Sequence, residues 1–392
     1  MTEAKAPPIA LALSGGGIRA MVFHLGVLKC LAEQRLLERV SNVSTVSGGS
    51  LILGLLLQEA GMKWPTSSQY LEDVLPALQQ KLCTRGLMGG MLRQLYHPRN
   101  WRFLASRANL VAGALREEWG IAGCLADLPE IPEWSINGTT AETGKRFRFK
   151  RDDLGDYVLG YAAAQYFPLA EAIAVSAAFP GGVGPLVIDS SDYEWQKRGW
   201  LESRDSAKPV RLPYAKLHLY DGGVYDNLGL EPFFDAGKGQ LKAVLAASTA
   251  IIVSDAGAPL SRGFSYFRMN PWRMKRVADI MSDQSRALRV RTFVSYLQRD
   301  LGRGSYLYIG EPVSNTSPCT SAGYAAEFPT TLKCLNRLEF EALVSHGYLV
   351  AAKNHSLFGL TGEVSLPFAG LGTPPRGGAV AEVAMTQQNE RA

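Results

Sequence analysis

The spacing of apolar residues predicts a strand, a helix and a second strand near the N-terminus. Residues 9–13 form a short apolar run that is typical of a buried strand. Residues 19–37 carry apolar side chains every three or four positions, at Val22, Leu25, Leu28, Leu31, Ala32 and Leu36. This spacing predicts an amphipathic helix that packs on a sheet. The β-branched run at 43–46 predicts the second strand, and the apolar run at 50–60 predicts a wholly buried helix after it.

The middle of the chain is less regular. Residues 62–130 are broken by prolines and glycines, and they carry arginines beside aromatic residues. We expect a helical insertion here, which either covers or borders the functional site or forms a plain helical layer. Residues 134–149 contain two alternating runs around Thr143-Gly144, which is the pattern of a β-hairpin. Residues 172–178 predict a helix of small residues.

Two short strands in the second half of the chain each end at an aspartate followed by small residues. Residues 217–220 lead into Asp221-Gly222-Gly223, and residues 251–254 lead into Asp255-Ala256-Gly257. Residues 273–299 then predict one or two basic helices. These elements together predict a three-layer α/β fold with a central, mostly parallel sheet and helices on both faces.

We expect one domain at residues 9–373, between a flexible N-terminus at 1–8 and a flexible tail at 374–392. Within the domain lie the helical insertion at 62–130 and a basic helical segment at 262–299. No internal repeat interrupts this organisation.

Composition narrows the class of protein and its partners. The chain has 392 residues, of which 46% are hydrophobic and 20% charged, as in globular proteins with a large core. A net charge of +5 favours an anionic surface such as phospholipid headgroups, is too weak to indicate nucleic acid, and equally fits ordinary solubility. Neither the cysteines nor the histidines show metal-ligand spacing, so we expect no metal and no disulfide frame. We see neither a signal core nor a run of about 20 apolar residues, so we expect a cytoplasmic protein that meets membranes from the surface.

Two glycine-rich turns carry the candidate chemistry. Gly15-Gly16-Gly17 follows the first strand and opens the first helix, so its backbone N–H groups can bind an anion. Ser47 lies on a tight strand-to-helix turn, Thr45-Val46-Ser47-Gly48-Gly49, which is the G-x-S-x-G nucleophile elbow with threonine in place of the first glycine. An anion-binding loop beside an exposed serine is the arrangement that acyl transfer needs. Asp221 can reach the open edge of such a site because two glycines follow it, although aspartate is also common in ordinary turns.

Two other functions fit parts of this pattern. Gly15, Gly17 and Ala20 match a dinucleotide-binding fingerprint, but no carboxylate ends the second strand to hold a ribose. A non-catalytic lipid- or nucleotide-binding module therefore stays open. A soluble carboxylesterase of the α/β-hydrolase type needs serine, aspartate and histidine in chain order, which Ser47, Asp221 and either His346 or His355 supply. That fold normally places its nucleophile after more strands than the two seen here.

Taken together, these segments resemble the patatin-like phospholipase family over roughly residues 8–260. The matching motifs are the glycine-rich Gly15-Gly16-Gly17-Ile18-Arg19, the elbow Ser47 with Gly49, the Asp221-Gly222-Gly223 box, the small-residue segment Val175–Pro180 and the hairpin Asn137–Phe149. Thr45 is the one departure from the family's elbow, and it implies a tighter turn.

The resemblance implies a Ser47–Asp221 dyad in place of a triad, with no metal or organic cofactor. Ser47 would attack an ester carbonyl and Asp221 would take its proton. The loop from Gly15 to Arg19 would form the oxyanion hole, and Arg19 would orient that loop or meet a phosphate. The N–H donors would be those of Gly16, Gly17 and Ile18. The implied function is hydrolysis of fatty acyl esters of glycerophospholipids, as a phospholipase A or lysophospholipase.

The segment at 262–299 combines an excess of arginine and lysine with aromatic residues. A basic helix of this kind can lie at a lipid interface, and it can equally be the solvated face of a packed helix. We hypothesise an interfacial role, with a phospholipid membrane surface as the partner.

Overall fold

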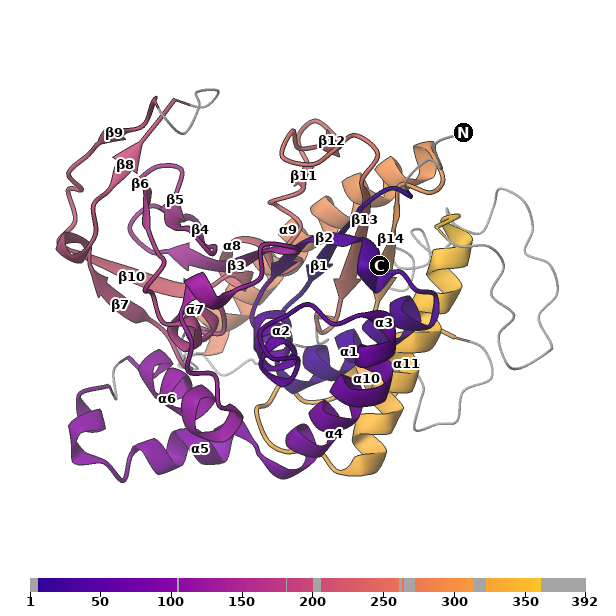
Figure 1. Ribbon diagram of the computed structural model, residues 1–392, viewed down its shortest axis with the longest axis horizontal. Helices are drawn as coiled ribbons and strands as arrows, with labels where there is room; N and C mark the ends of the chain where they lie inside the picture. The colour runs from indigo at the N-terminus through magenta and orange to yellow at the C-terminus, as the bar shows by residue number, and fades with distance from the viewer. Residues whose placement is uncertain are drawn as a thin grey trace.

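The computed structural model describes residues 6–103, 106–180, 182–199, 206–260, 263, 272–313 and 322–360. Parallel strands form the centre of its sheet (Figure 1), in the order β14 (Gly304–Tyr308), β13 (Ala250–Asp255), β1 (Ile9–Leu13), β2 (Val40–Thr45) and β3 (Glu133–Thr140). Every residue of β1 and β13 is buried. Helices cover both faces at this point, which explains why these two segments are apolar without alternation.

Antiparallel strands extend the sheet beyond β3. They are β4 (Lys145–Phe149), β5 (Asp153–Asp156), β6 (Gly160–Ala163), β8 (Gln196–Lys197) and β9 (Lys208–Pro209). The predicted hairpin is the pair β3–β4. A separate two-stranded sheet pairs β11 (Phe234–Asp235) with β12 (Gln240–Leu241).

Strand β10 (Lys216–Asp221) approaches β2 end to end along one edge of β3. Thr45 at the end of β2 pairs with Ile136, and Asp221 at the end of β10 pairs with Gly138 in the opposite direction. Strand β4 occupies the other edge of β3 at the same positions, so β2 and β10 share one edge. Their carboxyl ends therefore meet opposite Asn137. On its outer side, β10 pairs with β7 (Leu186–Asp189).

One face of the sheet carries most of the hydrophobic core. Four helices supply much of it: α1 (Gly17–Glu33), α2 (Gly48–Glu59), α7 (Leu169–Ser176) and α11 (Arg337–Leu357). Helix α2 is buried from Gly48 to Leu57, as its continuous apolar run predicts. Helices α1 and α11 lie side by side (Figure 1), so the C-terminal part of the described chain covers the first helix.

The opposite face is covered by the long helix α9 (Trp272–Arg299), a single helix in the region where one or two were expected. Phe293 and Leu297 are buried against the sheet, and Val290 packs beside them. Figure 1 shows α9 on the far side of β1 and β13 from α1, so the molecule has the predicted three layers.

The region at 62–130 is helical, as predicted. Its α-helices are α3 (Ser67–Gln69), α4 (Leu75–Thr84), α5 (Leu87–Gln94) and α6 (Ala108–Trp119), with a π-helical turn at Tyr70–Val74. Arg116 on α6 pairs with Glu171 on α7 at 2.7 Å, so the insertion borders the helix that leads to the small-residue turn at Ser176. A role as a lid remains a prediction.

The remaining short helices connect these layers. They are α8 (Gly223–Asp226), α10 (Ala322–Glu327) and 3-10 turns at Leu37–Arg39, Pro98–Phe103, Leu125–Asp127 and Ser190–Asp192. The tail at 374–392, residues 1–5 and residues 264–271 of the basic segment lie outside the described residues. Among the described helices, none is long and apolar enough to cross a bilayer.

Candidate active site

Ser47 occupies a strained turn between β2 and α2. Its backbone angles are φ 50° and ψ −115°, a combination that few non-glycine residues adopt. The elbow closes tightly because Gly48 lies against the glycine loop: a Cβ on Gly48 would lie 2.5 Å from the carbonyl oxygen of Gly17. The predicted strand–serine–helix turn is therefore present, and Gly48 is as constrained as the motif glycine Gly49.

Thr45 has a structural reason to replace the usual glycine of the elbow. Its hydroxyl accepts a hydrogen bond from the indole N–H of Trp134 at 2.8 Å and bonds the hydroxyl of Ser50 at 2.7 Å. Ser50 in turn bonds the hydroxyl of Ser176 at 2.7 Å. All of these groups are buried, so each depends on the next for its hydrogen bond.

The turn at Ser176–Ala178 holds the backbone of both candidate catalytic residues. The N–H of Ser47 donates to the carbonyl oxygen of Ser176 at 3.1 Å and to its hydroxyl at 3.1 Å. The N–H of Asp221 donates to the carbonyl oxygen of Ala178 at 3.0 Å. The sequence marks this small-residue segment but not the contacts of Ser176, because a serine within an apolar helix gives no signal of which backbone it will bind.

Asp221 is buried, with 4% of its surface exposed, and its carboxyl group is hydrogen-bonded to the Ser47 hydroxyl. The N–H of Gly223 also donates to Asp221 Oδ1, at 2.6 Å. Burial raises the pKa of Asp221 to about 7, although both hydrogen bonds work in the opposite direction. The structure thus brings together the serine and the aspartate that the sequence singled out, and it gives the carboxyl group a proton affinity suited to neutral pH.

The glycine loop lies directly beside this pair. A Cβ on Gly15 would lie 3.0 Å from the Cβ of Ser47, and a Cβ on Gly48 would lie 3.0 Å from the backbone nitrogen of Gly17. Gly16 and Gly17 have φ values of 149° and 61°, which explains why the loop needs glycine. The loop opens helix α1, so the positive end of that helix points toward the site.

Two of the loop's N–H groups already have acceptors. The N–H of Gly15 donates to the carbonyl oxygen of Asn227 at 3.1 Å, and that of Ile18 donates to the carbonyl oxygen of Thr331 at 2.9 Å. Among the described residues, the N–H groups of Gly16 and Gly17 have no such acceptor. The resemblance to the family implied Ile18 as a third donor, and its bond to a residue far along the chain could not be seen in the sequence.

Arg19 supports the loop from behind. Its guanidinium donates to the carbonyl oxygens of Ala256 (3.2 Å), Ala326 (3.2 Å) and Phe328 (2.7 Å). It is 2% exposed, and burial lowers its pKa to about 10. Of the two roles considered for Arg19, these contacts favour orientation of the loop over contact with a phosphate.

The candidate histidines have partners away from the dyad. His355 bonds the hydroxyl of Ser305 at 2.9 Å, and His346 bonds the carbonyl oxygen of Ile309 at 2.6 Å. Burial lowers the pKa of His355 to about 3, so this imidazole stays neutral. His24 is likewise buried, with its ring nitrogens 2.7 Å from the Ser254 hydroxyl and 3.0 Å from the Ser14 carbonyl oxygen. The serine–aspartate–histidine alternative gains no support from these positions.

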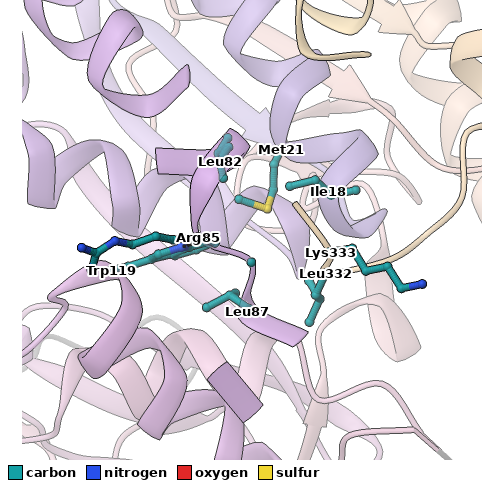
Figure 2. A pocket seen from close by; sticks show the side chains of 9 residues that line it. Ile18, Met21, Leu82, Arg85, Leu87, Trp119, Leu332 and Lys333 are labelled. Atoms are coloured by element: carbon teal, nitrogen blue, oxygen red, sulfur yellow. Dashed lines mark hydrogen bonds between the residues drawn. The ribbon is translucent and has the colours of Figure 1, made fainter. Parts of the chain in front are cut away.

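A small apolar pocket lies beside the glycine loop, at the junction of α1, α4 and α6 (Figure 2). It is lined by Ile18, Met21, Leu82, Leu87, Trp119 and Leu332, with Arg85, Gly86 and Lys333 completing it. Figure 2 shows Arg85 and Lys333 extending away from it in opposite directions. Neither Ser47 nor Asp221 lines this pocket, so it belongs to the packing of α1 and not to the reacting groups.

Within the described ranges, no group of three or more His, Cys, Asp or Glu side chains is placed to hold a metal ion.

The fold can be compared with those of two solved proteins, of which the first supports it. Human GIVD cytosolic phospholipase A2 matches with a TM-score of 0.50 at 13% identity, over 89% of this chain and 61% of that one. VipD from Legionella pneumophila matches at 14% identity with a TM-score of 0.37, over 89% of this chain and 66% of that one. The chain thus spans about three fifths of the human protein, and the likeness confirms the predicted α/β architecture.

No curated protein sequence matches the chain closely. The family model described as "Patatin-like phospholipase" matches residues 11–234, which contain the glycine loop, the elbow and the Asp-Gly-Gly box. That match covers more than half of the chain and confirms the resemblance found in the sequence. The chain belongs to the patatin-like phospholipase family.

Proposed function

We propose that the protein is a lipid acyl hydrolase that cleaves fatty acyl esters of glycerophospholipids, with Ser47 as nucleophile and Asp221 as base. Membership of its family implies lipid acyl hydrolysis. The observation that carries the proposal is the hydrogen bond between the Ser47 hydroxyl and a buried carboxyl group whose pKa is about 7. An ordinary aspartate, with a pKa of about 3.9, would be too weak a base at neutral pH.

In the first half of the reaction, Asp221 takes the hydroxyl proton as the Ser47 Oγ attacks the ester carbonyl carbon. The N–H groups of Gly16 and Gly17 stabilise the negative oxygen of the tetrahedral intermediate, and removing one such donor typically costs about 10²–10³-fold in turnover. The bond from that carbon to the alcohol oxygen then breaks. Asp221 returns the proton to the departing alcohol, which is the lysophospholipid, and the acyl group stays on Ser47.

In the second half, Asp221 takes a proton from water as the water oxygen attacks the acyl carbon. The bond to Ser47 Oγ breaks, the proton passes from Asp221 to that oxygen, and the fatty acid leaves. One buried carboxyl group therefore acts alternately as base and acid, which a pKa near neutrality favours.

The test compares wild type with Ser47→Ala and Asp221→Asn on phosphatidylcholine vesicles, with fatty acid and lysophospholipid measured by mass spectrometry. Both variants should lose turnover, and a fluorophosphonate probe should label Ser47 in wild type only. His355→Gln is the control for the histidine alternative, and it should retain turnover. A folded wild type that neither hydrolyses lipid nor reacts with the probe would contradict the proposal and favour a binding module.

We further propose that the outward side of α9, from Arg273 to Leu288, binds an anionic lipid surface. Successive helical residues turn by about 100°, so Met274, Val277, Met281 and Leu288 lie on the side opposite Phe293 and Leu297, which face the sheet. The four outward side chains are between 49% and 75% exposed. Arg273 and Lys275 are also exposed on this part of the helix, and Arg276 is half-buried. Apolar side chains flanked by cations suit the boundary between headgroups and acyl chains.

Charge reversal at Arg273, Lys275 and Arg276 should weaken binding to vesicles that contain phosphatidylserine. Reversal of three exposed lysines elsewhere, at Lys63, Lys208 and Lys216, changes the total charge equally and provides the matched control. Equal loss in both variants would mean that net charge alone governs binding, and no loss in the α9 variant would remove the interfacial role.

A further inference from the structure

The side chain of Asn227 lies where three strand ends meet. Asn227 follows helix α8, and its amide contacts the turn after β1 at Gly15, the turn after β10 at Gly223 and the turn after β13 at Gly257. A Cβ on Gly15 would overlap the amide oxygen, a Cβ on Gly223 would lie 2.7 Å from it, and a Cβ on Gly257 would lie 3.4 Å from the amide nitrogen. The amide fills space that glycine leaves open on three sides.

The backbone around Asn227 is fixed by its own hydrogen bonds. The carbonyl oxygen of Asn227 accepts from Gly15 N–H at 3.1 Å. The carboxylate of the preceding residue, Asp226, accepts from the N–H groups of Leu228 at 3.1 Å and Glu231 at 2.8 Å. The side chain of Asn227 is thus presented to the three turns by a loop that cannot easily swing away.

The amide also lies close to the candidate base. A Cβ on Gly223 would lie 2.7 Å from Asn227 Oδ1 and 3.0 Å from Asp221 Oδ1, so these two oxygens lie on either side of one position. They therefore lie within about 6 Å of each other, a separation at which charged groups shift each other's pKa. Within the described part of the chain the amide of Asn227 makes no side-chain hydrogen bond, so its contribution comes from its shape and its neutrality.

We propose that Asn227 is a positioning residue: its neutral amide acts as a spacer that sets the glycine loop against the Asp221–Gly223 turn and so aligns the N–H groups of the loop with Ser47. The inference rests on the proposed function. A smaller side chain would let the two turns close on each other, and a charged one would place a second carboxylate beside Asp221.

Two substitutions separate positioning from bulk structure. Asn227→Ala should lower kcat about 10–100-fold and change KM by less than about threefold, since a misplaced oxyanion donor affects the transition state and not substrate binding. Asn227→Asp is isosteric, and its negative charge should move the acidic limb of the kcat/KM profile about one unit toward higher pH, because a second carboxylate raises the pKa of the first. Asn336→Asp makes the same chemical change at the start of α11, where aspartate caps a helix equally well, and should shift nothing.

The outcomes are distinct. An unmoved pH limb in Asn227→Asp together with a kcat within twofold of wild type in Asn227→Ala overturns the inference and leaves the proposed function standing. If Asn227→Ala does not fold, the pH dependence of fluorophosphonate labelling in Asn227→Asp decides alone. A wild type without hydrolysis and without labelling overturns the proposed function and this inference with it.

Discussion

Asp221 and Asp255 end two strands of the same sheet in the same local turn, yet their surroundings differ. Each is buried, and each accepts a hydrogen bond from the N–H two residues later: Gly223 donates to Asp221 at 2.6 Å, and Gly257 donates to Asp255 at 3.0 Å. The sequence shows the same similarity, because both strands end in aspartate followed by small residues.

The difference lies in what else reaches each carboxyl group. Asp255 accepts from the Arg286 guanidinium at 2.9 and 2.6 Å and from the Tyr306 hydroxyl at 2.6 Å, so its charge is neutralised and its lone pairs are used. The bonds to Asp221 come from the Gly223 N–H and the Ser47 hydroxyl, and no cation pairs with it among the described residues. Identical turns thus produce a structural ion pair at one strand end and a candidate base at the other. The local motif does not distinguish Asp221 from Asp255, whereas the groups that bond each carboxyl group do.

The largest expected effect comes from neutralising the candidate base. Asp221→Asn should lower kcat about 10²–10⁴-fold, because the serine loses its proton acceptor. Turnover of a soluble ester such as p-nitrophenyl butyrate measures this without any contribution from membrane binding. If Asp221→Asn keeps a tenth or more of the wild-type kcat, Asp221 is not the base, and its role does not differ from that of Asp255 in the way proposed.

The next largest effect is a loss of stability on substitution of Asp255. Asp255→Asn should lower the free energy of unfolding by up to about 3–5 kcal/mol, because the buried Arg286 then keeps only its longer ion pair with Asp283, at 3.8 Å. Urea denaturation measures the loss. Replacing both partners, as in Asp255→Asn with Arg286→Met, should recover much of it; a double variant as unstable as the single one would mean that the ion pair is not the source.

The pH dependence of stability that comes from Asp221 should be opposite in sign to that of a carboxylate in an ordinary salt bridge. The pKa of Asp221 is raised in the folded protein, so between about pH 4 and 7 the folded state holds a proton that the unfolded state has lost, and stability falls as pH rises through this range. Asp221→Asn should therefore be more stable than wild type by a few kcal/mol at pH 8 and equal to it at pH 4. Thermal unfolding at both pH values is the measurement, and an equal difference at the two would contradict the raised pKa.

Activity should follow the same titration. Since the reaction needs the ionised carboxyl group, kcat/KM should fall about tenfold per pH unit below pH 7 and level off above it. A level profile down to pH 5 would place the base elsewhere.

The smallest effect concerns the scaffold that holds the elbow. Thr45→Val keeps the shape of the side chain but leaves the buried indole N–H of Trp134 without an acceptor, which typically costs about 1–3 kcal/mol, and Ser50 keeps only its bond to Ser176. Unfolding experiments measure this cost. Stability equal to wild type would show that these hydroxyl contacts do not contribute.

The parallel centre of the fold is predictable because strands covered on both faces are short, continuous apolar runs, as in residues 9–13 and 250–253. The antiparallel wing is not predictable in the same way. Strands such as β8 and β9 have two exposed residues each, so no alternation marks them. The pairing of β10 with β3 joins segments far apart in the chain, and local patterns carry no information on it.

In the candidate site too, features set by local sequence are predictable, and features set by contacts between distant segments are not. Ser47, Asp221 and the glycine loop are visible in the sequence because strained or crowded turns require glycine at fixed neighbours. The contributions of Ser176 and Asn227, and the bond from Ile18 to Thr331, arise only when distant segments pack together. These contacts join segments far apart in the chain, so no local pattern of residues marks them.

The meeting of β2 and β10 on one edge of β3 has a consequence for how the proposed site assembles. The pairing register with β3 (133–140) sets the positions of both β2 and β10. A register shift of one residue in either strand would move Ser47 or Asp221 by about 3.3 Å along that edge. A chain that has emerged from the ribosome only as far as residue 200 already holds the serine elbow but lacks its base. If Ser47 and Asp221 are the reacting pair, as proposed, hydrolysis becomes possible only after β10 has paired with β3.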